Sequence, residues 1–179
     1  DPYPEERARE RRIALTRLFS SLGFEPVEID LREYEGKREE LATRLRMCKL
    51  IWCSGGNSFW LRYVMKTSGF DKIIKDLLAE GIVFGGWGAG AVLVGPSVHP
   101  IELMDDPQKA PEIRYEGLCL IDYFIWPHWN TEKYVPLQEE ASRKMNELPY
   151  ETKVLRDGEV LIVKNGISEL IEQKPTDAM

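Results

Sequence analysis

The residues of this chain that are most suited to chemistry lie at 86–90, which read Gly86-Trp87-Gly88-Ala89-Gly90. The apolar run 82–84 before them is typical of a strand buried in a parallel sheet, and residues 89–94 are typical of the first turns of a packed helix. A strand, a sharp turn and a helix, with glycines on both sides of a central residue, form the nucleophile elbow of G-x-S-x-G hydrolases. The central residue here is Gly88, so the sequence has the turn that presents a nucleophile but not the nucleophile itself.

A second glycine-rich turn, Gly55-Gly56-Asn57-Ser58, follows the apolar run 48–53 and precedes a helical pattern at 59–67. Backbone N–H groups at such a turn suit an anion or an oxyanion. Asn57 or Ser58 would also cap the helix. Because the carboxyl ends of parallel strands meet at one edge of a sheet, we expect this turn to lie beside the elbow.

The residue placed to act as a general base is His128, which follows the strand-like run 118–126. A histidine at the same sheet edge, downstream of an elbow, can take the proton of a nucleophile. The competing interpretation is a histidine packed between Trp126 and Trp129. The other histidine, His99, lies in a long loop, where we expect a surface residue.

The carboxylate that would orient this base is expected in the loop 95–116, after the elbow helix. The candidates are Glu102, Asp105 and Asp106, and reasoning from the residues does not choose among them. Asp122 falls within a strand-like run and is assigned to packing or capping.

The elements that must position these groups alternate along the chain. Helices are expected at 4–22, 37–47, 59–67, 70–79 and 131–146, and strands at 24–31, 48–53, 82–84 and 118–126. The Asp157-Gly158 pair predicts a hairpin over 153–164, and Asn165-Gly166 a second turn into 167–171. The pattern predicts an α/β, three-layer fold with a mostly parallel sheet and a C-terminal hairpin. Because a helix comes before the first strand, we expect residues 1–179 to form one domain that lacks an N-terminal strand.

Composition excludes several classes of function. A net charge of −6 disfavours non-specific binding to nucleic acid or an anionic membrane, and no run is long enough to span a bilayer. The three cysteines, Cys48, Cys53 and Cys119, lack zinc-type spacing and indicate a reducing cytoplasm. The elbow glycines do not fit the G-x-G-x-x-G pattern of a dinucleotide site. We therefore expect a cytoplasmic monomer or homodimer without cofactor or metal.

Three motifs together resemble peptidase family S51, which includes aspartyl dipeptidase (dipeptidase E) and cyanophycinase. They are residues 53–59, residues 86–91, and residues 118–120 leading to Pro127-His128-Trp129, in the same order and with similar spacing. The resemblance implies a flavodoxin-like fold, similar to class I glutamine amidotransferases. It also implies a serine peptidase that cleaves short peptides through an acyl-enzyme, without metal or cofactor.

The resemblance further implies the roles of individual residues. Gly88 stands where the family has its nucleophilic serine, and His128 matches the catalytic histidine. Gly56 and Ala89 would supply the oxyanion-binding N–H groups, with Gly55 and Asn57 beside them as substrate-binding residues. By spacing, Glu102 is nearest to the family's acid, with Asp105 and Asp106 close behind. An aspartyl substrate would need a basic partner, for which Arg114 and Lys109 are candidates.

The expected function is therefore that of a serine peptidase for short, Asp-containing peptides, inactive or impaired because Gly88 replaces the nucleophile. Two explanations of Gly88 remain open: a natural pseudoenzyme that binds peptides, or a glycine in place of an original serine. The alternative from another class is a small-molecule binding or regulatory module.

Overall fold

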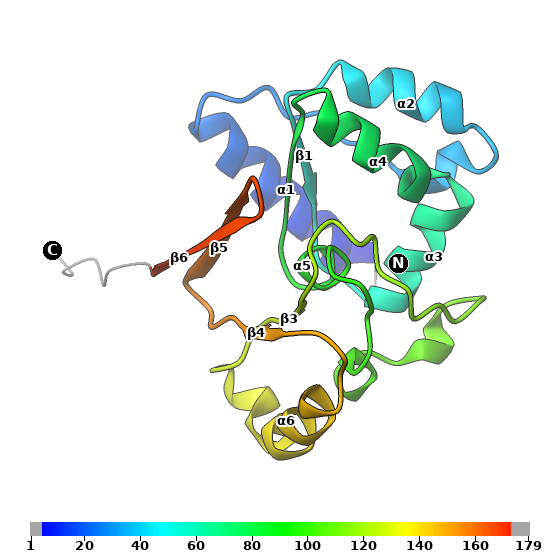
Figure 1. The fold of residues 1–179 in the computed structure, drawn as a ribbon. Helices are drawn as coiled ribbons and strands as arrows, with labels where there is room; N and C mark the ends of the chain where they lie inside the picture. Colours follow the sequence, from blue (N-terminus) through cyan, green and yellow to red (C-terminus); the bar gives the residue numbers. More distant parts are fainter. Residues whose placement is uncertain (1–4, 173–179) are drawn as a thin grey trace, which may run out of the picture.

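The computed structural model describes residues 5–172 and combines helices with parallel strands (Figure 1). The α-helices are α1 (Glu5–Ser21), α2 (Arg38–Arg46), α3 (Ser58–Thr67), α4 (Phe70–Ala79), α5 (Ala89–Val92) and α6 (Gln138–Asn146). The 3₁₀ helices are η1 (Leu31–Tyr34), η2 (Ile101–Leu103), η3 (Pro107–Lys109) and η4 (Glu132–Leu137). The strands are β1 (Leu50–Cys53), β2 (Val83–Gly86), β3 (Phe124–Trp126), β4 (Thr152–Val154), β5 (Glu159–Lys164) and β6 (Ile167–Glu172).

Two pairs of parallel strands carry the fold. β1 pairs with β2, with Cys53 opposite Gly86 at their carboxyl ends, and β3 pairs with β4, with Trp126 opposite Val154. The short helix α5 contacts both β2 and β3 and so links the two pairs. The predicted α/β fold with parallel strands is confirmed, although within the described residues the two pairs do not join into one ladder.

The core lies where α2, α3 and α4 meet the strands. In α4 the buried residues Phe70, Ile73, Ile74 and Leu77 recur at helical spacing and form one apolar stripe. On the other side of α5, Trp126 of β3 is fully buried as well. None of the helices in residues 5–172 has the length and the hydrophobicity that crossing a bilayer requires.

Most of the predicted helices form, with small shifts at their ends. The first helix, expected from residue 4, begins at Glu5 in the described part of the chain, and residue 4 lies outside that part. The helix expected at 131–146 is split, because Pro136 interrupts it: η4 precedes α6. A proline removes one backbone donor and clashes with the preceding turn.

The strand expected at 24–31 does not form. Residues 24–30 belong to no ladder, and the segment then turns into η1, where the side chain of Asp30 accepts a hydrogen bond from the N–H of Arg32. Ile29 and Leu31 still pack against the core. The alternation of apolar and acidic side chains therefore does not mark a strand here, because Phe24 and Val27 are exposed and no neighbouring strand in the described residues pairs with this segment.

The strand expected at 118–126 is shorter than predicted. Only 124–126 belongs to β3, whereas the N–H groups of Leu118 and Leu120 donate to the carbonyl oxygens of Leu93 and Val94, at 2.8 Å each. The first half of this apolar run thus holds the end of the elbow helix instead of extending a strand.

The prediction of a hairpin over 153–164 is also wrong. Residues 152–154 form β4 and pair in parallel with β3, while β5 pairs with β6 in an antiparallel hairpin. The hairpin turn is the second predicted one: Asn165 and Gly166 have φ angles of 52° and 76°, which a type I′ turn requires. The Asp157-Gly158 turn connects strands of two different sheets.

Candidate functional site

The elbow predicted around Gly88 is present at the point where β2 passes into α5. Gly88 has φ 51° and ψ −121°, a backbone conformation in which a residue with a side chain is strained. A Cβ at this position would lie 3.5 Å from Cα of Gly55 and 3.7 Å from Nε2 of His128. A side chain at residue 88 would therefore fit without a clash and would lie beside the histidine.

Two other glycines, Gly86 and Gly90, bring the glycine-rich turn after β1 close to the elbow. A Cβ at Gly90 would lie 2.3 Å from the carbonyl oxygen of Cys53, and a Cβ at Gly86 would lie 2.9 Å from the carbonyl carbon of Gly90. The end of β1 and the first turn of α5 consequently pack backbone against backbone. This contact places the turn after β1 next to Gly88.

His128 faces the elbow with one ring nitrogen and a carboxylate with the other. Its Nδ1 lies 2.6 Å from Oδ1 of Asp157. The hydroxyl of Thr131 donates to Oδ2 of Asp157 at 2.6 Å, and the N–H of Asp157 donates to Oδ1 of Asn130 at 2.8 Å. These bonds fix the carboxylate and, through it, the imidazole.

The surroundings of Asp157 favour its charged form. Partial burial acts to raise the pKa of Asp157, but the hydrogen bonds from Thr131 and His128 outweigh it, so the pKa lies below its usual value. An ionised carboxylate accepts the Nδ1 proton of the imidazole and leaves Nε2 free to accept a proton.

The structure corrects the choice of Glu102 as the partner of His128. Oε1 of Glu102 lies 2.6 Å from Nδ1 of His99 and 3.4 Å from Nζ of Lys144. Asp106 accepts from the N–H of Gln108 and caps η3. His99 is thus not a free surface residue, and neither of these two acids reaches the elbow histidine.

The third candidate, Asp105, lies at the site but serves another contact. Its Oδ2 accepts hydrogen bonds from the N–H of Ser58 at 2.8 Å and from the hydroxyl of Ser58 at 2.7 Å. Burial raises the pKa of Asp105 and is only partly opposed by these two bonds. Asp105 therefore ties the long loop to the start of α3.

Asp157 follows β4 in the way that His128 follows β3. Because the two strands are parallel, the residues after them emerge at the same edge. The same rule predicted the other site residues, but it could not be applied to Asp157 once β4 had been assigned to a hairpin. The signal that could have found it is an aspartate a few residues after the short strand-like segment 152–155.

The side chain of Asn57 is occupied by the protein itself. Its Oδ1 accepts from the N–H of Trp60 at 2.9 Å, as a helix cap, and its Nδ2 donates to the carbonyl oxygen of Asp106 at 2.9 Å. The capping role predicted for Asn57 is present, and these two bonds use both of its polar atoms.

The groups that could take part in a reaction line one crevice of about 480 Å³. It is lined by the residues that the sequence analysis grouped together, namely Gly55, Gly56, Gly88, Ala89 and His128, and also by Asp157. Among the described residues, the N–H groups of Gly56 and Ala89 have no hydrogen-bond acceptor. Both are therefore available to an oxyanion in the crevice.

The basic residues of the crevice are not the predicted ones. Arg114 pairs with Glu112 at 2.6 Å, and neither Arg114 nor Lys109 lines the crevice. Arg11, from α1, and Lys133, from η4, line it instead. No sequence motif pointed to Arg11, because α1 precedes every motif of the site.

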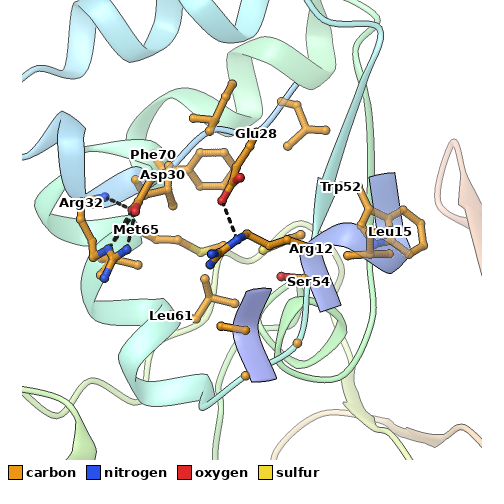
Figure 2. A pocket seen from close by; sticks show the side chains of 18 of the residues that line it. Arg12, Leu15, Glu28, Asp30, Arg32, Trp52, Ser54, Leu61, Met65 and Phe70 are labelled. Carbon is orange, nitrogen blue, oxygen red and sulfur yellow. Dashed lines mark hydrogen bonds and ion pairs between the residues drawn. The ribbon is translucent and has the colours of Figure 1, made fainter. Parts of the chain in front are cut away.

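A neighbouring hollow of about 300 Å³ lies between α1, β1 and α3 (Figure 2). An ion pair between Arg12 and Glu28, 3.2 Å long, spans it, and Asp30 binds Arg32 beside it. Its lining is largely apolar and does not include His128 or Gly88. The groups that could act on a substrate thus gather in the crevice and not in this hollow.

The thiol of Cys53, at the end of β1, does not add a nucleophile to the site. Burial raises the pKa of the Cys53 thiol to about 12, which keeps it protonated. Within residues 5–172, no three His, Cys, Asp or Glu side chains are grouped so that they could hold a metal ion.

Comparisons with known proteins agree with this geometry. The family model of peptidase family S51 matches residues 12–171. An uncharacterized peptidase of Listeria innocua is 31% identical over 153 residues, which cover 81% of this chain and 72% of the relative. One of Listeria monocytogenes is 33% identical over 126 residues, which cover 69% of this chain and 60% of the relative.

Among solved structures, a crystal structure from Listeria monocytogenes, described as a candidate peptidase E, superposes with a TM-score of 0.79 at 26% identity. The superposition covers 89% of this chain and 76% of the other. This likeness confirms the flavodoxin-like fold class that the motifs implied. The chain belongs to peptidase family S51.

Proposed function

We propose that the crevice is the substrate site of a serine-type peptidase in which only the nucleophile is missing. The observation that carries this proposal is the position of residue 88. A Cβ there would lie 3.7 Å from Nε2 of His128, whose Nδ1 is held by Asp157. A serine hydroxyl at that place would be within reach of its general base.

The rest of the machinery is assigned as follows. A peptide carbonyl lies over Gly88, with its oxygen between the N–H groups of Gly56 and Ala89. His128 is the general base, and Asp157 orients it. Glycine has no atom that can attack a carbonyl, so the chain binds the peptide and forms no acyl-enzyme.

Short acidic peptides are the ligands that the charges favour. Arg11 and Lys133 bring two cations to the crevice, while its two carboxylates already accept hydrogen bonds, Asp105 from Ser58 and Asp157 from His128 and Thr131. Because Arg11 is engaged with the carbonyl oxygen of Gly55, a carboxylate on the peptide would meet Lys133.

Calorimetric titration of the unaltered chain tests this function. Dipeptides and tripeptides with an N-terminal aspartate are compared with matched peptides that carry asparagine. The expected result is saturable binding of the acidic peptides, weaker binding of the asparagine peptides, and full recovery of both peptides after long incubation.

A matched pair of variants tests whether the peptide binds in the crevice. Lys133→Met should weaken the binding of the acidic peptides, whereas Lys109→Met, outside the crevice, should not. Failure of every peptide to bind would contradict the proposed function, and cleavage by the unaltered chain would contradict the role given to residue 88.

A further inference from the structure

Arg11 makes an unusual contact for a residue of α1. Its Nη1 donates a hydrogen bond of 2.6 Å to the carbonyl oxygen of Gly55, 44 positions along the chain. Arg11 is half-buried and lines the crevice, whereas Arg17, further along the same helix, is exposed. The bond therefore joins α1 to the turn that supplies the N–H of Gly56.

The hydrogen bond from Arg11 orients the peptide group between Gly55 and Gly56, which the local sequence constrains little. Two successive glycines, Gly55 and Gly56, place few restrictions on the backbone. The peptide between them is trans, so the carbonyl of Gly55 and the N–H of Gly56 point in opposite directions. A donor that holds the carbonyl on the α1 side directs the N–H away from Arg11.

The same contact also strengthens the N–H as a donor. A guanidinium that donates to a carbonyl oxygen polarises the peptide group, and hydrogen bonds in series reinforce one another. The N–H of Gly56 has no acceptor among the described residues, so its donor capacity is available to a ligand.

We infer that Arg11 is a positioning residue, which orients the Gly55–Gly56 peptide so that the N–H of Gly56 binds the oxyanion of the substrate. This inference rests on the proposed function. The competing explanation is that Arg11 only fastens α1 to the sheet. Another contact already attaches α1 to the sheet: the ring of Phe19 packs edge-on against Trp52 of β1, with centroids 5.3 Å apart.

Kinetics of variants in a Gly88→Ser background separate the two explanations. Loss of one oxyanion donor costs hydrolases about 10²–10³ in kcat, so a misdirected donor should cost about tenfold or more. Arg11→Met should therefore lower kcat with little change in KM, and Arg11→Lys should recover part of the loss. Arg17→Met is the matched control, and a kcat for Arg11→Met equal to that of the control would overturn the inference.

A second measurement does not depend on activity. In the unaltered Gly88 chain, Arg11→Met should shift the amide resonance of Gly56 in a ¹H–¹⁵N spectrum, whereas Arg17→Met should leave it unchanged. If Gly88→Ser is inactive, the proposed function fails, and this spectrum still tests Arg11. An unmoved Gly56 resonance would then overturn the inference.

Discussion

Oδ1 of Asp157 lies 2.6 Å from Nδ1 of His128, and each residue follows the end of one of the parallel strands β4 and β3 within three positions. The acid that orients the histidine is therefore supplied by the end of a strand and not by the loop that follows the elbow. This arrangement leaves the long loop free for another task, which Asp105 performs at the start of α3.

The first prediction distinguishes Asp157 from Glu102. In a Gly88→Ser background, Asp157→Asn should lower kcat by about 10⁴, because an amide donates to Nδ1 and stabilises the wrong tautomer of the imidazole. Glu102→Gln, which removes a carboxylate bound to His99, should leave kcat within about twofold. Steady-state kinetics on one dipeptide measure both. Equal losses in the two variants would contradict the assignment of Asp157.

The second prediction concerns pH and Asp105. Because burial raises its pKa above the ordinary value of 3.8, Asp105 contributes most to stability below that value, where it is protonated in both the folded and unfolded states. The contribution is lost as the pH rises through the raised pKa of the folded state. Asp105→Asn lacks this titration, so the Tm of the unaltered chain relative to that of the variant should fall between pH 3 and pH 7.

Thermal unfolding of both proteins across this range is the measurement. A parallel pair of Tm curves would show that Asp105 ionises in the folded state as readily as in the unfolded one. Serine at position 58 remains in both proteins, so its hydrogen-bonding needs are the same in the comparison.

The third prediction concerns the buried ion pair between Arg62 and Asp71, whose side chains are 7% and 8% exposed and 3.2 Å apart. Arg62 also donates to the carbonyl oxygen of Glu116 at 2.6 Å. Arg62→Met should lower the free energy of unfolding by about 3–5 kcal/mol, because it leaves Asp71 charged, buried and unpaired.

Urea unfolding of single and double variants checks this. The double variant Arg62→Met/Asp71→Leu should be more stable than Arg62→Met alone, since it removes the unpaired charge as well. A double variant as unstable as the sum of both single variants would contradict an energetic coupling between the two residues.

The sequence was sufficient for those parts of the site that depend on local patterns. The glycines around Gly88 predict a sharp turn, and the short apolar runs before Gly55 and His128 predict that both lie at the same sheet edge. Each of these inferences needs only the residues beside it and the rule that parallel strands end together. The structure brings Gly55, Gly88 and His128 together, although within the described residues β3 does not share a ladder with β1 and β2.

The parts that could not be predicted depend on which distant segments meet. Residues 152–154 have the same local pattern whether they pair with β5 or with β3, and only the pairing with β3 brings Asp157 to His128. The contact of Arg11 with Gly55 likewise joins segments that no periodicity connects. A strand pattern also cannot reveal that no strand within residues 5–172 pairs with the segment, as for residues 24–30.

The fourth prediction is the cost of a side chain at residue 88. Gly88→Ala and Gly88→Ser should each lower the free energy of unfolding by about 1–2 kcal/mol, because the backbone at φ 51° strains any residue with a Cβ. A steric clash does not contribute to this cost, since the atom nearest to a Cβ at residue 88 would be 3.5 Å away. Chemical denaturation of both variants measures the cost, and no loss in either would contradict the strain.

The most direct test of the account is peptide hydrolysis by Gly88→Ser. The variant is incubated with short acidic peptides, and the release of amino acids is compared with that of Gly88→Ala, which has the same Cβ but no hydroxyl. The account predicts hydrolysis by Gly88→Ser, none by Gly88→Ala, and a loss of at least about 10³-fold in Gly88→Ser/His128→Gln. A folded Gly88→Ser variant that cleaves no more peptide than Gly88→Ala would contradict the claim that only the nucleophile is missing.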